Sequence, residues 1–118
     1  MSGITASILL RSAFTVADTG RVTRILRDLA DDVTETRKGR HWEFTVDNAH
    51  ASLSVLSTSD YDFDFEDDLL ANSLLFEQAP EAFLLSFGSS RDSDREACSL
   101  LVARLIESFG GIHCGFGA

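Results

Sequence analysis

The chain has 118 residues, 44% of them apolar and 25% charged, with a single proline, which predicts one folded domain over residues 1–118. Its formal net charge is −9, and residues 41–118 alone carry three basic and fourteen acidic side chains. Because such a surface repels phosphate groups, we expect neither nucleic acid nor an anionic membrane as a partner.

The sequence carries no pattern typical of secretion or of membrane insertion. No stretch approaches the roughly 20 apolar residues of a membrane-spanning helix, and the first residues lack the basic and apolar regions of a signal peptide. Two cysteines, Cys98 and Cys114, are too few for a disulfide framework, and Cys98 is expected to be a small buried group in a helix. These features predict a soluble protein of the cytoplasm.

The first expected elements are a strand over residues 4–14 and an amphipathic helix over residues 18–33. Leu9 interrupts the polar face of the strand, which predicts cover on both sides near its middle. Asp18 is the expected N-cap of the helix, and a capping box of Thr15 with Asp18 is the alternative. The apolar face of the strand holds Ile4, Ala6, Ile8, Leu10 and Phe14, and that of the helix holds Val22, Ile25, Leu26, Leu29 and Val33.

Residues 41–56 are predicted to form a β-hairpin around a two-residue turn at positions 47–48. In that register Trp42 opposes Leu53, so the apolar side chains share one face and Trp42 lies in the core. Exposure of Trp42 as an anchor for a partner is the alternative. The opposite, open face of the sheet would carry His41, Glu43, Thr45, His50, Ser52 and Ser54.

In the second half of the chain, one segment has an ambiguous secondary-structure pattern and the segments after it have clear ones. Residues 66–78 fit either a short helix or an apolar loop, whereas residues 82–87 form an apolar run that predicts a buried central strand. A second helix is expected to begin with a capping box of Ser93 and Glu96 and to end before Gly110.

A last edge strand over residues 112–116 completes the expected order, which is strand, helix, two strands, a variable segment, strand, helix and strand. This order predicts an α+β fold. We expect a ferredoxin-like two-layer sandwich, with a mainly antiparallel sheet of about 4–6 strands and two helices on one face.

The most unusual stretch is residues 60–68, in which acidic and aromatic residues alternate from Asp60 to Glu66. In an extended chain a period of two separates the carboxylates from the rings, so the rings can pack on a core while the acids stay in water. A solvated edge or loop whose acids prevent aggregation is the alternative interpretation. The candidate partner-binding residues are Asp60, Tyr61, Asp62, Asp64, Glu66, Asp67 and Asp68, with Tyr61 as an aromatic anchor.

Metal and catalytic chemistry find little support in the sequence. A calcium loop counted from Asp60 would need glycine and glutamate where Phe65 and Ala71 stand, and no zinc-type spacing occurs. His113 and Cys114 are adjacent on an expected strand, so their side chains would point opposite ways. We therefore predict no catalytic residues, no metal and no cofactor. The polar groups left for an enzyme are His41, Glu43 and His50 on the open face.

These patterns lead to one main hypothesis of function. The chain is expected to be a non-catalytic binding protein, a monomer or homodimer, whose acidic segment binds a basic protein partner. An immunity or inhibitor protein that neutralises a toxic enzyme is one concrete form. A small-molecule regulatory or sensor domain and a small enzyme that uses the polar sheet face are the alternatives.

Overall fold

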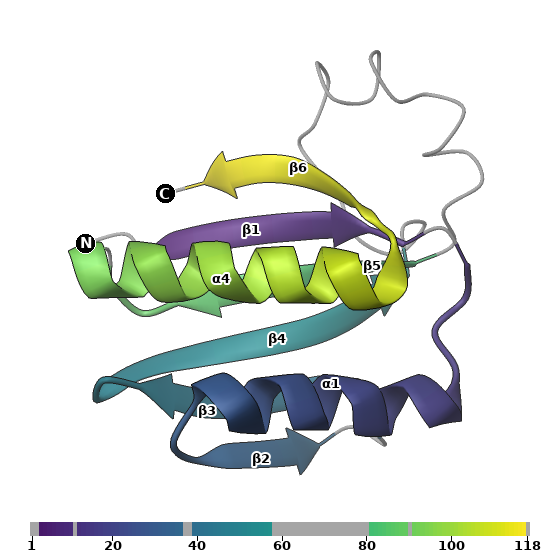
Figure 1. The fold of residues 1–118 in the computed structure, drawn as a ribbon, viewed down its shortest axis with the longest axis horizontal. Coiled ribbons are helices and arrows are strands. Elements are labelled where there is room, and N and C mark those ends of the chain that lie inside the picture. The colour runs from purple at the N-terminus through teal and green to yellow at the C-terminus, as the bar shows by residue number, and fades with distance from the viewer. Residues whose placement is uncertain (1–2, 11, 37–38, 58–80, 90, 118) are drawn as a thin grey trace.

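The computed structural model describes residues 3–10, 12–36, 39–57, 81–89 and 91–117. Within them the chain forms six strands and two helices (Figure 1). In chain order they are β1 (Ile4–Leu9), α1 (Val16–Leu29), β2 (Val33–Thr36), β3 (His41–Val46), β4 (Ala49–Ser57), β5 (Glu81–Phe87), α4 (Asp92–Phe109) and β6 (Ile112–Gly117).

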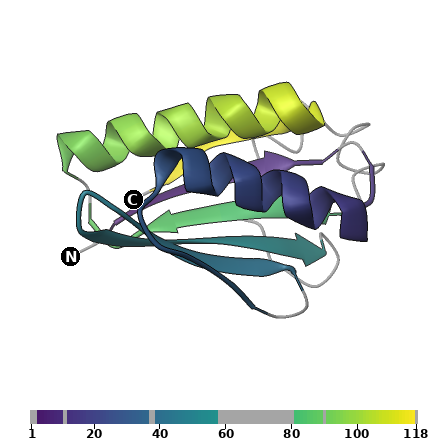
Figure 2. The same ribbon diagram turned by 60° about the horizontal axis from the view of Figure 1, so that its bottom comes forward.

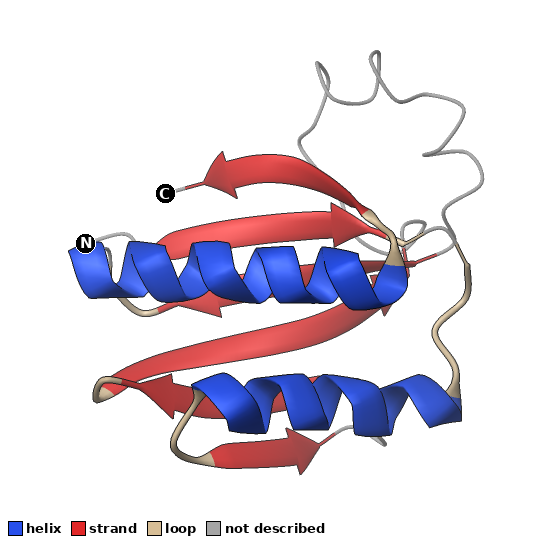
Figure 3. Cartoon of the chain, in the orientation of Figure 1, coloured by secondary structure: helices blue, strands red, loops and turns tan. Residues whose placement is uncertain are grey.

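The strands form one antiparallel sheet in the order β2-β3-β4-β5-β1-β6. Both helices lie over the same face of this sheet (Figures 1 and 2). The molecule therefore has two layers, one of helices and one of strands (Figure 3). The prediction of a small α+β fold with an antiparallel sheet and two helices is confirmed. The apolar core lies between the two layers.

The first strand is shorter than predicted, because β1 ends at Leu9. The next two expected core residues, Leu10 and Phe14, are nevertheless buried, because the backbone N–H of Leu10 donates to the carbonyl of Glu81 at 3.0 Å and holds the chain beside β5. The predicted cover on both sides of β1 is confirmed, since Leu9 and Ser7, on the face opposite the helices, are buried as well.

Helix α1 begins after Thr15, so the alternative cap is right and the prediction of Asp18 as the N-cap is wrong. The backbone N–H of Thr15 donates to the Asp18 carboxylate at 2.9 Å, and the N–H of Asp18 donates to the Thr15 carbonyl at 3.0 Å. These two hydrogen bonds satisfy backbone N–H groups that have no acceptor within the helix. They also place a carboxylate in the first turn, where the helix dipole is positive.

The predicted end of this helix at residue 33 is wrong, because α1 stops at Leu29 and the chain enters the sheet. The N–H of Asp31 donates to the carbonyl of Thr45 at 2.9 Å, and the N–H of Thr45 donates to the carbonyl of Asp32 at 3.2 Å. Val33 therefore begins β2, an edge strand paired with β3 that the sequence analysis missed. Its spacing continued the helical pattern, but the backbone hydrogen bonds to a distant strand decide its conformation.

The predicted hairpin of β3 and β4 is confirmed in its register, with Trp42 opposite Leu53. Asp47 and Asn48 have φ angles of 50° and 64°, which are the left-handed values that a tight type I′ turn requires. Trp42 is fully buried, so the core interpretation is right and the exposed anchor is wrong.

The predicted central strand is also confirmed, because β5 lies between β4 and β1. Helix α4 begins at Asp92 with Arg91 at the N-cap, so the predicted capping box of Ser93 and Glu96 is wrong. Gly110 ends the helix with φ 71° and donates its N–H to Ile106 at 2.7 Å, as expected of a glycine at this position. The last strand, β6, lies at the sheet edge as predicted.

Two glycines offer a matched test of this backbone geometry. A Cβ added at Gly20, inside α1, or at Gly110 meets no atom within 4 Å, but only Gly110 has a left-handed φ. We expect Gly20→Ala to stabilise the fold by about 1 kcal/mol and Gly110→Ala to destabilise it by about 1 kcal/mol. Calorimetry should show melting temperatures displaced in opposite directions by about 4 °C. Displacement in the same direction would contradict the assigned backbone conformations.

Candidate functional site

The seven predicted partner-binding residues lie between positions 58 and 80, outside the described residues. The residues that precede and follow this segment in the chain are described. Ser57, at the end of β4, pairs with Glu81, at the beginning of β5. The intervening segment therefore leaves and re-enters the sheet at adjacent positions, on two neighbouring strands.

The charge of the protein is concentrated in this segment. The chain has nineteen acidic and ten basic residues, and residues 58–80 hold seven of the acids and none of the basic residues. The segment thus carries a charge of −7, and the rest of the chain, with twelve acids and ten basic residues, carries −2. A nearly balanced body with one strongly anionic insertion is a charge distribution suited to steering a cationic partner.

Four of the seven described arginines form ion pairs with acids of the described region. The acids in these ion pairs all lie outside residues 60–68. Four arginines form such pairs: Arg21 with Asp18 at 3.0 Å, Arg91 with Asp94 at 3.0 Å, Arg104 with Asp28 at 3.2 Å, and Arg40 with Glu81.

Glu81 anchors the point at which the acidic segment re-enters the sheet. One oxygen of its carboxylate accepts the backbone N–H of Phe14 at 2.8 Å, and the other pairs with Arg40. The guanidinium of Arg40 also lies 6.0 Å from the centre of the Phe14 ring. These contacts join β5, the β1–α1 connection and the start of β3, so the base of the segment is held by three parts of the chain.

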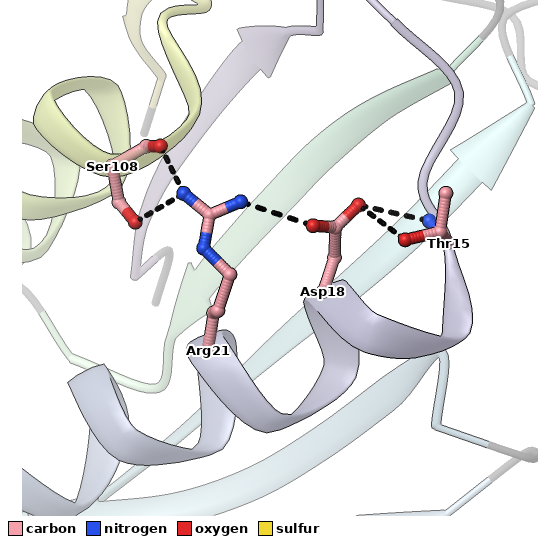
Figure 4. A network of polar contacts seen from close by, with 4 residues as sticks. All are labelled: Thr15, Asp18, Arg21 and Ser108. Carbon is pink, nitrogen blue, oxygen red and sulfur yellow. Dashed lines mark hydrogen bonds and ion pairs between the residues drawn. The ribbon is translucent and has the colours of Figure 1, made fainter.

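Arg21 ties the two helices together beside this end of the sheet (Figure 4). It pairs with Asp18, donates to the hydroxyl of Ser108 at 2.9 Å and to its carbonyl, and stacks 4.3 Å from the centre of the Phe109 ring. The backbone hydrogen bond from Thr15 and the bonds from the Thr15 hydroxyl and Arg21 hold the pKa of Asp18 below its ordinary value, although burial opposes the change. This network is structural, because every group in it already has a partner.

The polar side chains expected on the open face do lie on the face away from the helices. His50 Nε2 lies 3.1 Å from a Glu43 carboxylate oxygen, and His41 Nδ1 lies 2.6 Å from the Ser54 hydroxyl. Each is a cross-strand pair between β3 and β4, and His50 stands opposite Thr45, four residues along the strand from His41. The two histidines therefore form separate pairs and do not converge on one point, so these contacts assemble no nucleophile–base–orienter set.

A buried carboxylate at the start of α4 is the polar cluster that the sequence analysis missed. Asp94 is fully buried and accepts hydrogen bonds from the Ser89 hydroxyl and from Arg91 Nε and Nη2, the latter two at 3.0 and 3.1 Å. Arg91 also donates to the carbonyl of Asp47 at 3.1 Å. The hydrogen bonds from Arg91 and Ser89 hold the pKa of Asp94 below its ordinary value. An arginine three residues before an aspartate was the available sequence signal.

The described part of the chain offers few reactive groups. Cys98 is a buried free thiol whose pKa burial raises to about 11, so it stays protonated, and its predicted burial in a helix is confirmed. No helix among the described residues is long and apolar enough to cross a membrane. Within the same residues, no group of three or more His, Cys, Asp or Glu side chains is placed to hold a metal ion. Comparisons of the chain with protein-family models, curated proteins and solved structures find no match.

Proposed function

We propose that this chain is a non-catalytic binding protein that presents the acidic segment of residues 60–68 to a basic protein partner. The observation that carries the proposal is the distribution of charge, with −7 between residues 58 and 80 and −2 in the rest of the chain. A concentrated charge of one sign steers a partner of the other sign and accelerates association at low salt.

The ion pairs of the folded body support this assignment. Four of its arginines form ion pairs with acids outside the segment, which favours carboxylates of the segment that are offered to a partner. Repulsion among clustered carboxylates opposes compact structure unless a cation compensates it. A partner rich in lysine and arginine would supply that compensation, with Tyr61 as an aromatic anchor within the contact.

We further propose that the scaffold is a ferredoxin-like sandwich. Strands β4, β5, β1 and β6 are adjacent in the sheet, and helices α1 and α4 follow β1 and β5. On this reading β2 and β3 extend the four-stranded core at one edge. The assigned role is that of a cytoplasmic immunity or inhibitor protein, whose carboxylates enter the cationic cleft of a toxic enzyme.

Neutralising Asp62, Asp64 and Asp67 together with asparagine tests the proposed surface. We expect affinity for the basic partner, isolated from the native organism by affinity capture, to fall by about 10- to 100-fold at low salt. The effect should shrink as salt screens the charges. Isothermal titration calorimetry at two salt concentrations measures both results, and the melting temperature should not fall, because like-charge repulsion is relieved.

The matched control changes the same net charge on the folded body. Glu35, Asp92 and Glu107 are exposed acids on β2 and α4, and the variant Glu35→Gln, Asp92→Asn, Glu107→Gln also removes three negative charges. Its affinity should remain within about threefold of the unmodified chain. Equal weakening by both variants would assign the effect to net charge, and an unchanged affinity in the first variant would remove the proposal.

A further inference from the structure

A groove lined by apolar and acidic side chains lies where the end of α1, the β3–β4 turn and the first half of α4 meet. The buried side chains of Val46 and Leu101 line it, together with the partly buried Leu29 and Ala97. Leu100 is also part of the lining and is 48% exposed, which makes it one of two exposed large apolar residues in the described chain. We call this feature the α1–α4 groove.

The groove exists because α1 ends before it can cover the first half of α4. The helices contact each other through Arg104 with Asp28 and through Ser108 with Arg21, in the second half of α4. Residue 100 lies four positions before Arg104 and therefore on the same side of α4. Figure 1 shows the first turns of α4 extending past the end of α1. The helix layer is thus incomplete above this part of the sheet.

Carboxylates are the charged groups that line the groove. Asp47, in the hairpin turn, and Glu96, on α4, are both exposed, and none of the described residues that line the groove is basic. Arg91 lies next to the groove, where it donates to the carbonyl of Asp47 at 3.1 Å and interacts electrostatically with its carboxylate. Two further exposed acids, Asp31 and Asp32, directly follow α1 and are hydrogen-bonded through their backbone to Thr45, next to the groove. An occupant that adds apolar contact here therefore gains from positive charge at its flanks.

We propose that the α1–α4 groove docks a basic amphipathic helix of a partner protein. The helix would continue the layer formed by α1 and α4, with its apolar side chains on Ala97 and Leu100. Ala97 permits close approach of a second helix, whose axis would lie about 8–10 Å from that of α4. Lysine or arginine side chains of the occupant would lie beside Glu96, which they compensate, and beside Asp47, where they add to the charge of Arg91.

This inference takes the basic character of the partner from the proposed function, but it uses a different surface. The groove lies beside the turn from which β4 begins, whereas the acidic segment follows the last residue of β4. Nine residues of extended strand separate the two places by about 30 Å. Substitutions in one surface therefore leave the other unchanged, and the two proposals can fail independently.

The test titrates the full ¹⁵N-labelled chain with a synthetic helical peptide of about 18 residues, with leucine along one face and lysine elsewhere. Backbone amide shifts are expected around Leu29, Val46 and residues 93–101. Leu100→Gln should weaken binding about fivefold, because half of a leucine side chain no longer becomes buried. Val16→Gln is the matched control, since Val16 is 92% exposed at the start of α1, away from the groove, and should leave the affinity unchanged.

A second variant examines the charges. Asp47→Asn with Glu96→Gln keeps the shape of the groove, and it should weaken binding and reduce its salt dependence. Shifts confined to residues 58–80, or equal effects of Leu100→Gln and Val16→Gln, would overturn the groove assignment while leaving the proposed acidic surface intact. Groove shifts that depend on protein concentration without peptide would identify a second copy of the chain as the occupant and overturn it too.

Discussion

Replacing Trp42 with alanine is expected to lower the free energy of unfolding by about 3–5 kcal/mol. The indole is fully buried, its ring centre lies 6.1 Å from that of Phe14 in an edge-to-face arrangement, and its Nε1–H donates to the Thr23 hydroxyl at 2.9 Å. Alanine removes all three contributions and leaves a cavity between α1 and the sheet. Because domains of this size are stable by only about 5–15 kcal/mol, the variant should be close to unfolding.

Two smaller substitutions separate the packing of Trp42 from its hydrogen bond. Thr23→Val leaves the buried indole N–H without its acceptor and should cost about 1–3 kcal/mol. In the double variant with Trp42→Phe the donor is gone too, so we expect the two losses to be less than additive. Urea unfolding followed by circular dichroism measures each value, because Trp42 is the single tryptophan and the variants that carry Trp42→Phe have no tryptophan fluorescence. If the two losses of unfolding free energy were strictly additive, that would contradict a direct hydrogen bond between Trp42 and Thr23.

Replacing Asp94 with alanine is expected to cost about 2 kcal/mol, because the buried acceptor of three hydrogen bonds is lost. Arg91 is half exposed and can be solvated by water, so the loss stays below that of a fully buried ion pair. Asp94→Asn keeps the shape but removes the charge and should cost less. Asp92→Asn, at an exposed acid in the same turn, is the control and should cost a few tenths of a kcal/mol.

The pH dependence gives the same carboxylate a second test. Hydrogen bonds from Arg91 lower the pKa of Asp94 in the folded state relative to the unfolded chain. Its contribution is therefore fully present above the unfolded pKa, near 3.8, and is lost as pH falls through the lower folded pKa. The difference in unfolding free energy between the unmodified chain and Asp94→Asn should hold from about pH 7 to pH 5 and shrink below about pH 4. If this difference in unfolding free energy stayed the same at every pH, it would contradict a charged Asp94 carboxylate in the folded state.

Local patterns were sufficient where neighbouring residues determine the structure. The hairpin of β3 and β4 was predictable because strict alternation fixes which side chains share a face and the turn at 47–48 tolerates left-handed φ angles. The burial of Trp42 and the glycine end of α4 at Gly110 follow from equally short-range rules. The concentration of acids in residues 60–68 also needs no structure to be recognised.

Contacts between distant residues decided the rest. Ser93 with Glu96 matches a capping box, yet the helix begins at Asp92 and Asp94 is buried against Arg91. Arg91 is held from a distance, because it also donates to the carbonyl of Asp47 in the β3–β4 turn. Val33 fits the helix period, yet it joined the sheet because Asp31 and Asp32 bond the backbone of Thr45. That early end of α1 is also what leaves Ala97 and Leu100 uncovered, so the groove has no signature in the sequence. Charge and alternation are local properties of a chain, whereas the end of a helix depends on which distant backbone groups compete for its hydrogen bonds.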